Sequence, residues 1–217
     1  MIAAPLVGLV GALLLPQYTG GLDEELANIS AHIERWLAGN FLVILSFFLM
    51  APAVLGVLHL LRERSVALGH VGAALALLGI FFHGAIIGYS LVEAPLVESE
   101  FEKERVVEFT TRMYESPAFI MILAPFVGVS LGMTILAVAL WRANVVPVWI
   151  SALIVMALLS EFVGTDALSP ELLYAFLLVG LRWLGLKVLR TPDAQWSGPS
   201  RAAPEAGRMV GEPAPAS

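Results

Sequence analysis

Long apolar runs separated by short polar stretches dominate the sequence. Six segments are almost wholly apolar, at about residues 2–16, 38–61, 66–92, 118–141, 145–164 and 171–190. A helix rises about 1.5 Å per residue, so about 20 residues cross the hydrocarbon core of a bilayer. Five of the segments reach or approach that length, and the segment at 2–16 is shorter. The pattern predicts an all-α, polytopic membrane helical bundle with about six transmembrane helices.

Two connections between these spans have a mixed apolar and polar pattern. In the connection 20–37, apolar residues recur at helical spacing, namely Leu22, Leu26, Ile29, Ile33 and Trp36. This spacing predicts an amphipathic helix on the outer membrane surface. The connection 93–117 is predicted to be partly helical as well. Both connections are acidic, and they form either a solvated cap or a vestibule that attracts cations.

The composition supports a membrane protein. Hydrophobic residues make up 59% of the 217 residues and charged residues 14%, whereas soluble domains have about 45–50% apolar and about 25% charged residues. The mean hydropathy is +0.85. Cysteine is absent, which excludes disulfides, thiolate metal sites and a cysteine nucleophile. Nothing in the sequence predicts nucleic-acid binding.

The basic residues are distributed unevenly between the connections. One side carries eight of them: Arg62, Arg64, Arg142, Arg182, Lys187, Arg190, Arg201 and Arg208. The opposite side carries four: Arg35, Lys103, Arg105 and Arg112. The positive-inside rule therefore places the first side in the cytoplasm of a bacterium, and with six spans both termini lie there. Residues 191–217 are rich in Pro, Ala, Gly and Ser, which predicts a disordered cytoplasmic tail after a transmembrane domain at 1–190.

Small residues at four-residue spacing predict which helices pack together. The third span contains Gly84-x-x-x-Gly88, and the fourth contains Gly128-x-x-x-Gly132. Such pairs allow two helix backbones to approach closely in lipid. The sequence therefore predicts that the third and fourth spans pack against each other through these two motifs.

His83 lies in the middle of the apolar stretch FFHGAIIGYSLVEAPL. It shares one helix stripe with Gly72, Ala76 and Gly79, and a stripe of small residues faces another helix rather than lipid. His83 is therefore predicted to point into the bundle. Two interpretations remain open. A hydrogen bond to Ser130 or Thr134 of the fourth span would make His83 structural, whereas an unpaired imidazole would bind a ligand or carry a proton.

Three further polar residues of the outer membrane half fall near His83 in the predicted arrangement. Tyr89 and Glu93 follow it on the same helix, and Glu161 lies near the outer end of the fifth span. Together these residues are predicted to bind a cation, a polar headgroup or a proton. The alternative is that the two acids only mark the outer interface. No ligand spacing indicates a metal, and the cofactor stays unknown.

Two other features of the apolar segments have more than one interpretation. Arg182 interrupts the sixth span, and its side chain either extends to the cytoplasmic interface or binds a buried partner or an anionic headgroup. His59 and His70 flank the turn between the second and third spans at similar depth. They are either interfacial histidines or a facing pair that holds haem or a metal.

The layout resembles small six-span membrane proteins of unknown function that are abundant in high-GC bacteria, especially actinobacteria. The stretches that carry the resemblance are HIERWLAGNFLVIL, GYSLVEAPL and LGMTILAVALWRANVVPVWISALI. The resemblance implies a helical inner-membrane protein and supplies no catalytic residues. The sequence also lacks the common catalytic motifs, which disfavours an enzyme.

These observations predict a binding or transport module for a small cation or an amphiphile. The alternative is a non-catalytic accessory or structural subunit of a membrane complex. The partners would be the lipid bilayer and either further copies of the chain or other subunits.

Overall fold

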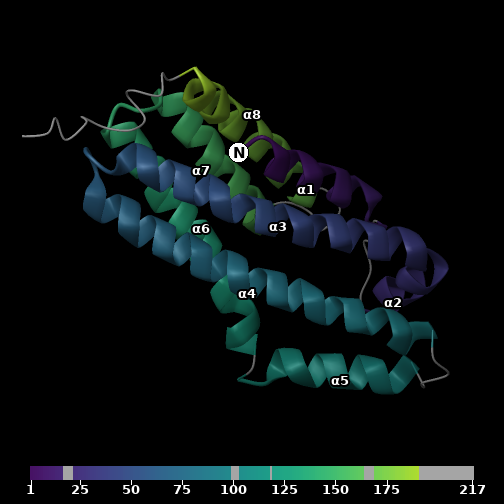
Figure 1. Cartoon of the computed structure of the whole chain (residues 1–217). Coiled ribbons are helices and arrows are strands. Elements are labelled where there is room, and N and C mark those ends of the chain that lie inside the picture. Colours follow the sequence, from purple (N-terminus) through teal and green to yellow (C-terminus); the bar gives the residue numbers. More distant parts are fainter. Residues whose placement is uncertain (17–21, 99–102, 118, 164–168, 191–217) are drawn as a thin grey trace, which may run out of the picture. The chain divides into compact units, whose positions relative to one another are not determined.

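The computed structural model of the chain is all-α. It describes residues 1–16, 22–98, 103–117, 119–163 and 169–190, and within the helices the side chains of residues 22–23, 89–90, 92–98, 103–104, 106, 110, 113–114, 121–122, 161–163 and 169 are not described. In these ranges there are eight helices (Figure 1): α1 (Ala3–Leu14), α2 (Leu22–Ala31), α3 (Ile33–Leu61), α4 (Val66–Glu98), α5 (Lys103–Glu115), α6 (Phe119–Arg142), α7 (Val148–Val163) and α8 (Ser169–Leu189). The predicted tail 191–217 lies outside the described residues.

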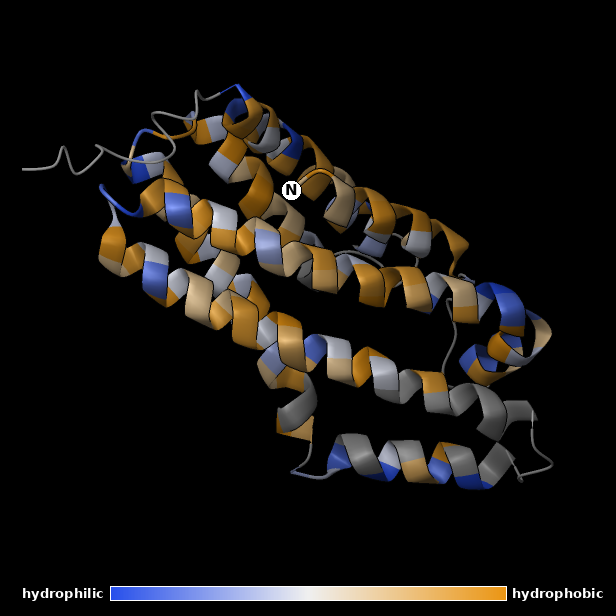
Figure 2. Ribbon diagram, viewed as in Figure 1, coloured by the Kyte–Doolittle hydropathy of each residue, from blue (hydrophilic) through white to orange (hydrophobic). Residues whose placement is uncertain are grey.

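Four of the described helices are long and apolar enough to cross a membrane. Their candidate spans are Ile33–Leu61, Val66–Gly88, Leu123–Arg142 and Pro170–Leu189. Hydrophobic residues make up most of the length of these helices (Figure 2). The predicted segments 2–16 and 145–164 correspond to shorter apolar helices, Ala3–Leu14 and Val148–Ser160. The all-α architecture is thus confirmed, and four of the six predicted spans correspond to described helices that are long and apolar enough to cross a membrane.

Contacts divide the chain into two units, Met1–Gly185 and Leu186–Ser217, and the packing described here belongs to the first. Its core is a continuous cluster of buried apolar side chains from the long helices and from α1 and α7. Helix α1 packs along α3 in the opposite direction. The Ser46 hydroxyl donates a 2.8 Å hydrogen bond to the carbonyl of Ala4, near the start of α1. Arg35, near the start of α3, donates to the carbonyls of Leu13 and Leu14 at the end of α1.

The stripe of small residues on α4 is the surface that packs against α6. A Cβ added to Gly132 would lie 2.7 Å from the Cα of Ala76 and 2.8 Å from the carbonyl oxygen of Gly72. A Cβ added to Gly128 would lie 3.2 Å from the Cα of Gly79. The two backbones therefore touch, as small residues permit. This confirms that the stripe below His83 faces another helix.

The predicted partner of the α6 motif is wrong. Gly128 and Gly132 of α6 contact residues 72–79 of α4, one to three turns before the predicted pair Gly84 and Gly88. In the described part of the chain, a Cβ added to Gly84 or to Gly88 would meet no atom within 4 Å. The third and fourth spans do pack together, but the axial offset between them differs from the one that the two motifs predict.

The predicted helix at 20–37 is divided in two. Helix α2 ends at Ala31, His32 adopts φ −135° and ψ 36°, and α3 begins at Ile33. The residues after the break continue into the second predicted span, so this span begins earlier than residue 38. Ile29 of α2 and Trp36 of α3 form a small buried cluster, against which Leu91 of α4 packs. The cluster joins α2 to the ends of both long helices. Helix α5 confirms the helical part of the connection 93–117.

A helix-ending turn and an arginine fix the connection between α6 and α7. Asn144 has φ 54°, and the N–H groups of Asn144 and Val145 donate to the carbonyls of Trp141 and Leu140. This is a Schellman arrangement, in which Asn is one of the few residues that tolerate the left-handed conformation. Arg64, in the turn between α3 and α4, donates a 3.0 Å hydrogen bond to the carbonyl of Ala143. The two turns therefore lie at the same end of the bundle.

Replacing Arg35 with Met should lower the free energy of unfolding by about 1 kcal/mol, because two hydrogen bonds to the last carbonyls of α1 are lost. The Arg35 Nε atom lies 2.6 Å from the carbonyl oxygen of Leu14. Arg112→Met is the control, since the partner of Arg112 in the described structure is Glu108, in an exposed pair four residues away; its expected effect is below about 0.5 kcal/mol. Unfolding by SDS in mixed micelles measures both. Equal effects would show that Arg35 does not hold α1.

Candidate functional site

His83 is buried within the bundle. It follows Gly79 by one turn on α4, so the close approach of α4 to α6 brings the imidazole in among the helices. Its exposed fraction is only 9%. The predicted inward orientation of His83 is therefore confirmed.

Two aromatic rings from neighbouring helices enclose the imidazole. Phe47 of α3 stacks on it, with ring centroids 4.3 Å apart and an angle of 28° between the planes. Phe126 of α6 meets it edge to face, with centroids also 4.3 Å apart and an angle of 69°. The two phenylalanines hold the ring in one orientation. Sequence reasoning missed both residues, because neither differs in pattern from the other apolar residues of its span.

The Nδ1 atom of His83 is buried and forms no hydrogen bond with any described residue. The predicted partners Ser130 and Thr134 do not bond to it; Ser130 lines the same cavity, and Thr134 does not. A buried polar atom without a partner costs about 1–3 kcal/mol. Such a group is therefore a candidate for contact with a molecule that is not part of the chain.

A small cavity lies against His83, and we call it the His83 cavity. Its volume is about 40 Å³, and its wall consists of Ser46, Phe47, Met50, Ile80, His83, Phe126, Val129, Ser130, Met133, Leu158, Leu173, Tyr174 and Leu177. No Asp, Glu, Lys or Arg is among these described residues. The Ser46 hydroxyl already donates to the carbonyl of Ala4. The cavity is thus apolar and uncharged, with a few hydrogen-bonding groups.

The other predicted site residues are not brought to His83 by the described structure. The side chains of Tyr89, Glu93 and Glu161 lie outside the described residues, so the predicted cluster stays a prediction. Arg182 is exposed on the surface of α8. Its exposure is consistent with a side chain that extends to the interface, and both interpretations of Arg182 stay predictions.

A larger apolar groove lies between α3 and α4, and we call it the α3–α4 groove. Its volume is about 490 Å³, and it is lined by Ile44, Phe47, Phe48, Ala51, Leu77, Ile80, Phe81, Gly84, Ala85 and Gly88. None of these side chains is polar. Phe48 and Phe81 are 66% and 71% exposed, so the groove opens on the outer surface of the bundle. The signal for it in the sequence was Gly84-x-x-x-Gly88, which predicted an internal helix contact instead.

The groove and the cavity share part of their walls. Phe47 and Ile80 line both of them. The Phe47 ring therefore has one face against His83 and belongs at the same time to the wall of the groove.

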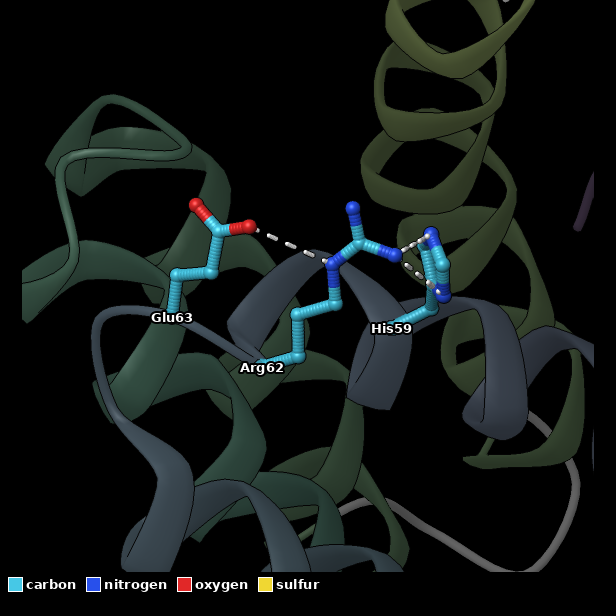
Figure 3. Close-up of polar contacts among 3 residues, drawn as sticks. All are labelled: His59, Arg62 and Glu63. Atoms are coloured by element: carbon cyan, nitrogen blue, oxygen red, sulfur yellow. Dashed lines mark hydrogen bonds and ion pairs between the residues drawn. The ribbon is translucent and has the colours of Figure 1, made fainter. Parts of the chain in front are cut away.

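The histidines near the turn between α3 and α4 do not act as a facing pair. Arg62 donates a 2.9 Å hydrogen bond to Nε2 of His59 and also contacts Glu63 at 3.6 Å (Figure 3). His70 is exposed and bonds through Nδ1 to the carbonyl of Val66 in its own helix. Among the described residues, no group of three His, Cys, Asp or Glu side chains is arranged to hold a metal ion.

Four helices that are long and apolar enough to cross a bilayer place the protein in the class of helical membrane proteins. Comparisons of the sequence with protein-family models, with curated proteins and with solved structures found no match. The resemblance to small six-span proteins of actinobacteria therefore stays a prediction.

Proposed function

We propose that the protein is an integral inner-membrane protein that binds an amphiphile, with the apolar chain of the ligand in the α3–α4 groove. Six spans and two cytoplasmic termini belong to the proposal, and the distribution of basic residues supports them. The observation that carries it is the groove itself. Its volume of about 490 Å³ falls within the range of about 300–1,000 Å³ that is typical of ligand pockets.

The lining of the groove determines the chemistry of the part of the ligand that it takes. All ten lining side chains are apolar or glycine, so a polar or charged group would lose its hydrogen bonds there. A hydrocarbon chain forms no hydrogen bonds with water, so it loses none when it enters the groove. Of the two predicted ligands, the amphiphile is therefore favoured over the small cation.

The position of the groove between two helices of one hairpin supports a single chain as its occupant. A helix is about 10–12 Å wide with its side chains, whereas a hydrocarbon chain is one methylene wide. The groove separates two helices of the same hairpin, and the cluster of Ile29, Trp36 and Leu91 joins these helices beyond it. A slot of this kind suits a chain that enters from the bilayer.

One observation favours a second candidate function, an accessory subunit that binds a partner helix. Gly84 and Gly88 are separated by one helix turn, and their open faces meet no atom within 4 Å in the described structure. This is the surface that a second transmembrane helix uses for close approach. A hydrocarbon chain and a partner helix would occupy the same groove. Methyl groups added at Gly84 and Gly88 should affect the binding of the two differently.

The test is photolabelling of the purified protein in nanodiscs with a phospholipid that carries a diazirine in its acyl chain. Gly84→Leu combined with Gly88→Leu fills the groove and should lower labelling of α3 and α4 at least about tenfold. Gly84→Ala combined with Gly88→Ala adds only two methyl groups and should leave labelling within about twofold. Val71→Leu is the control, because Val71 is exposed on α4 outside the groove.

Unchanged labelling in the leucine pair would exclude the groove as the binding site of a chain. Crosslinking of the same samples tests the second candidate. A dimer that is lost in the alanine pair would identify the groove as a surface for helix packing, because even a methyl group prevents the backbone contact that such packing needs.

A further inference from the structure

We propose that the polar end of the amphiphile is an uncharged hydroxyl group that enters the His83 cavity past Phe47. This inference rests on the proposed function and narrows its ligand to a long-chain alcohol. It starts from the one described histidine that is buried without a partner. The exposed fraction of His83 is 9%, its side chain lines the cavity, and its Nδ1 atom is buried without a hydrogen bond to any described residue.

The position of the cavity connects it with the chain-binding groove. Phe47 and Ile80 separate the two spaces and contribute to the walls of both. A ligand whose chain lies in the groove therefore has its end next to Phe47. When the Phe47 ring rotates away from His83, the imidazole becomes accessible from the groove. The same ligand then occupies both spaces.

The volume of the cavity limits the size of the polar end. The cavity measures about 40 Å³, and a cavity needs at least about 10–15 Å³ to hold one water molecule. A terminal carbon with its hydroxyl group therefore fits this space. A phosphate, a sugar or a quaternary ammonium group is several times larger. The head must therefore be compact.

The wall of the cavity limits the charge of the polar end. None of the described lining residues is Asp, Glu, Lys or Arg, so a charged head would have no opposite charge beside it. Burying an unpaired charge is far more costly than burying a hydrogen-bonded hydroxyl group. The aromatic rings of Phe47 and Phe126 add apolar surface on two sides of the imidazole.

A hydroxyl group matches the hydrogen-bonding capacity of this wall. It donates one hydrogen bond and accepts others, so it pairs with His83 Nδ1 whichever tautomer the imidazole adopts. Ser130 lines the same cavity from α6 and offers a second partner for the hydroxyl group. A carbonyl group, in contrast, accepts only.

The experiment is competition against a long-chain primary alcohol that carries a diazirine in its chain, with the full chain in nanodiscs. The unlabelled competitors have the same chain length and are the alcohol, the alkane and the quaternary ammonium amphiphile. The alcohol should compete about threefold to tenfold better than the alkane, the difference that one hydrogen bond makes. The ammonium amphiphile should compete no better than the alkane.

Two variants test whether His83 is the residue that makes the protein prefer the alcohol to the alkane. His83→Phe keeps an aromatic ring and removes the hydrogen bond. The unlabelled alcohol should then compete with the probe no better than the alkane does. His83→Asn keeps a hydrogen-bonding group near the Nδ1 position and should retain part of the preference. The comparison of the three competitors on the unsubstituted chain tests the inference even if a variant fails to fold.

The outcomes separate this inference from the proposed function. Equal competition by the alcohol and the alkane would overturn the hydroxyl inference, while chain binding in the groove would stand. Stronger competition by the ammonium amphiphile would also overturn it and would restore a cation as ligand. No labelling by the probe at all, in a folded protein, would contradict both the inference and the proposed function.

Discussion

Gly132→Val is expected to lower the free energy of unfolding by about 3 kcal/mol or more, the largest effect among the substitutions considered. A Cβ at this position would lie 2.7 Å from the Cα of Ala76 and 2.8 Å from the carbonyl oxygen of Gly72. Both neighbours are backbone atoms, so no side-chain rotation relieves the contact. Helices α4 and α6 would have to separate, and their packing contacts along the stripe would be lost.

Gly84→Val is the matched control for this substitution. It makes the same chemical change in the other glycine pair, on a surface where a Cβ meets no described atom within 4 Å. Its expected effect on the free energy of unfolding is below about 1 kcal/mol, because only the helix propensity of the residue changes. SDS-induced unfolding of both variants in mixed micelles gives the comparison. If Gly84→Val is as damaging as Gly132→Val, the axial offset between α4 and α6 described above is incorrect.

His83→Phe is expected to raise the free energy of unfolding by about 1 kcal/mol, because it removes a buried polar atom that has no partner. The phenyl ring would keep the contacts with Phe47 and Phe126, whose centroids lie 4.3 Å from that of the imidazole. The cavity of about 40 Å³ beside it accommodates the larger ring. A buried polar residue that lowers the stability of the fold indicates a role other than packing, and ligand binding is such a role.

Ser151→Ala provides the contrast, because Ser151 is a buried polar residue that does have a partner. Its hydroxyl donates a 2.7 Å hydrogen bond to the carbonyl of Ala137. Its loss should lower the free energy of unfolding by about 0.6 kcal/mol, the average for such bonds between membrane helices. The two substitutions should therefore have opposite signs in the same unfolding experiment. A decrease of more than about 1 kcal/mol in His83→Phe would assign His83 a structural role instead.

The position of His83 could be predicted because it depends on one helix only. Gly72, Ala76, Gly79 and His83 form a stripe through helical periodicity, and a stripe of small residues has to face a neighbour in lipid. The neighbours themselves could not be predicted. Phe47 and Phe126 reach the imidazole from two other helices, and their places there depend on how far each helix is rotated and shifted.

The error at Gly84 and Gly88 has the same origin. The two glycine motifs are alike in sequence, so pairing them was the simplest assumption. In the structure, α6 meets the earlier stripe of α4, and the glycines at 84 and 88 line the groove instead. Many contacts along both helices decide the axial offset together, and no single motif determines it.

By itself, the sequence determined the class of the protein, the places of most of its helices and the inward face of α4. These properties follow from hydropathy and from the 3.6-residue period, which act within one segment. The tertiary structure decided the environment of His83, the cavity beside it and the groove between α3 and α4. These features arise where side chains of different helices meet, and every face of an apolar helix can enter such a contact in a bilayer, so their positions depend on the packing of the whole bundle.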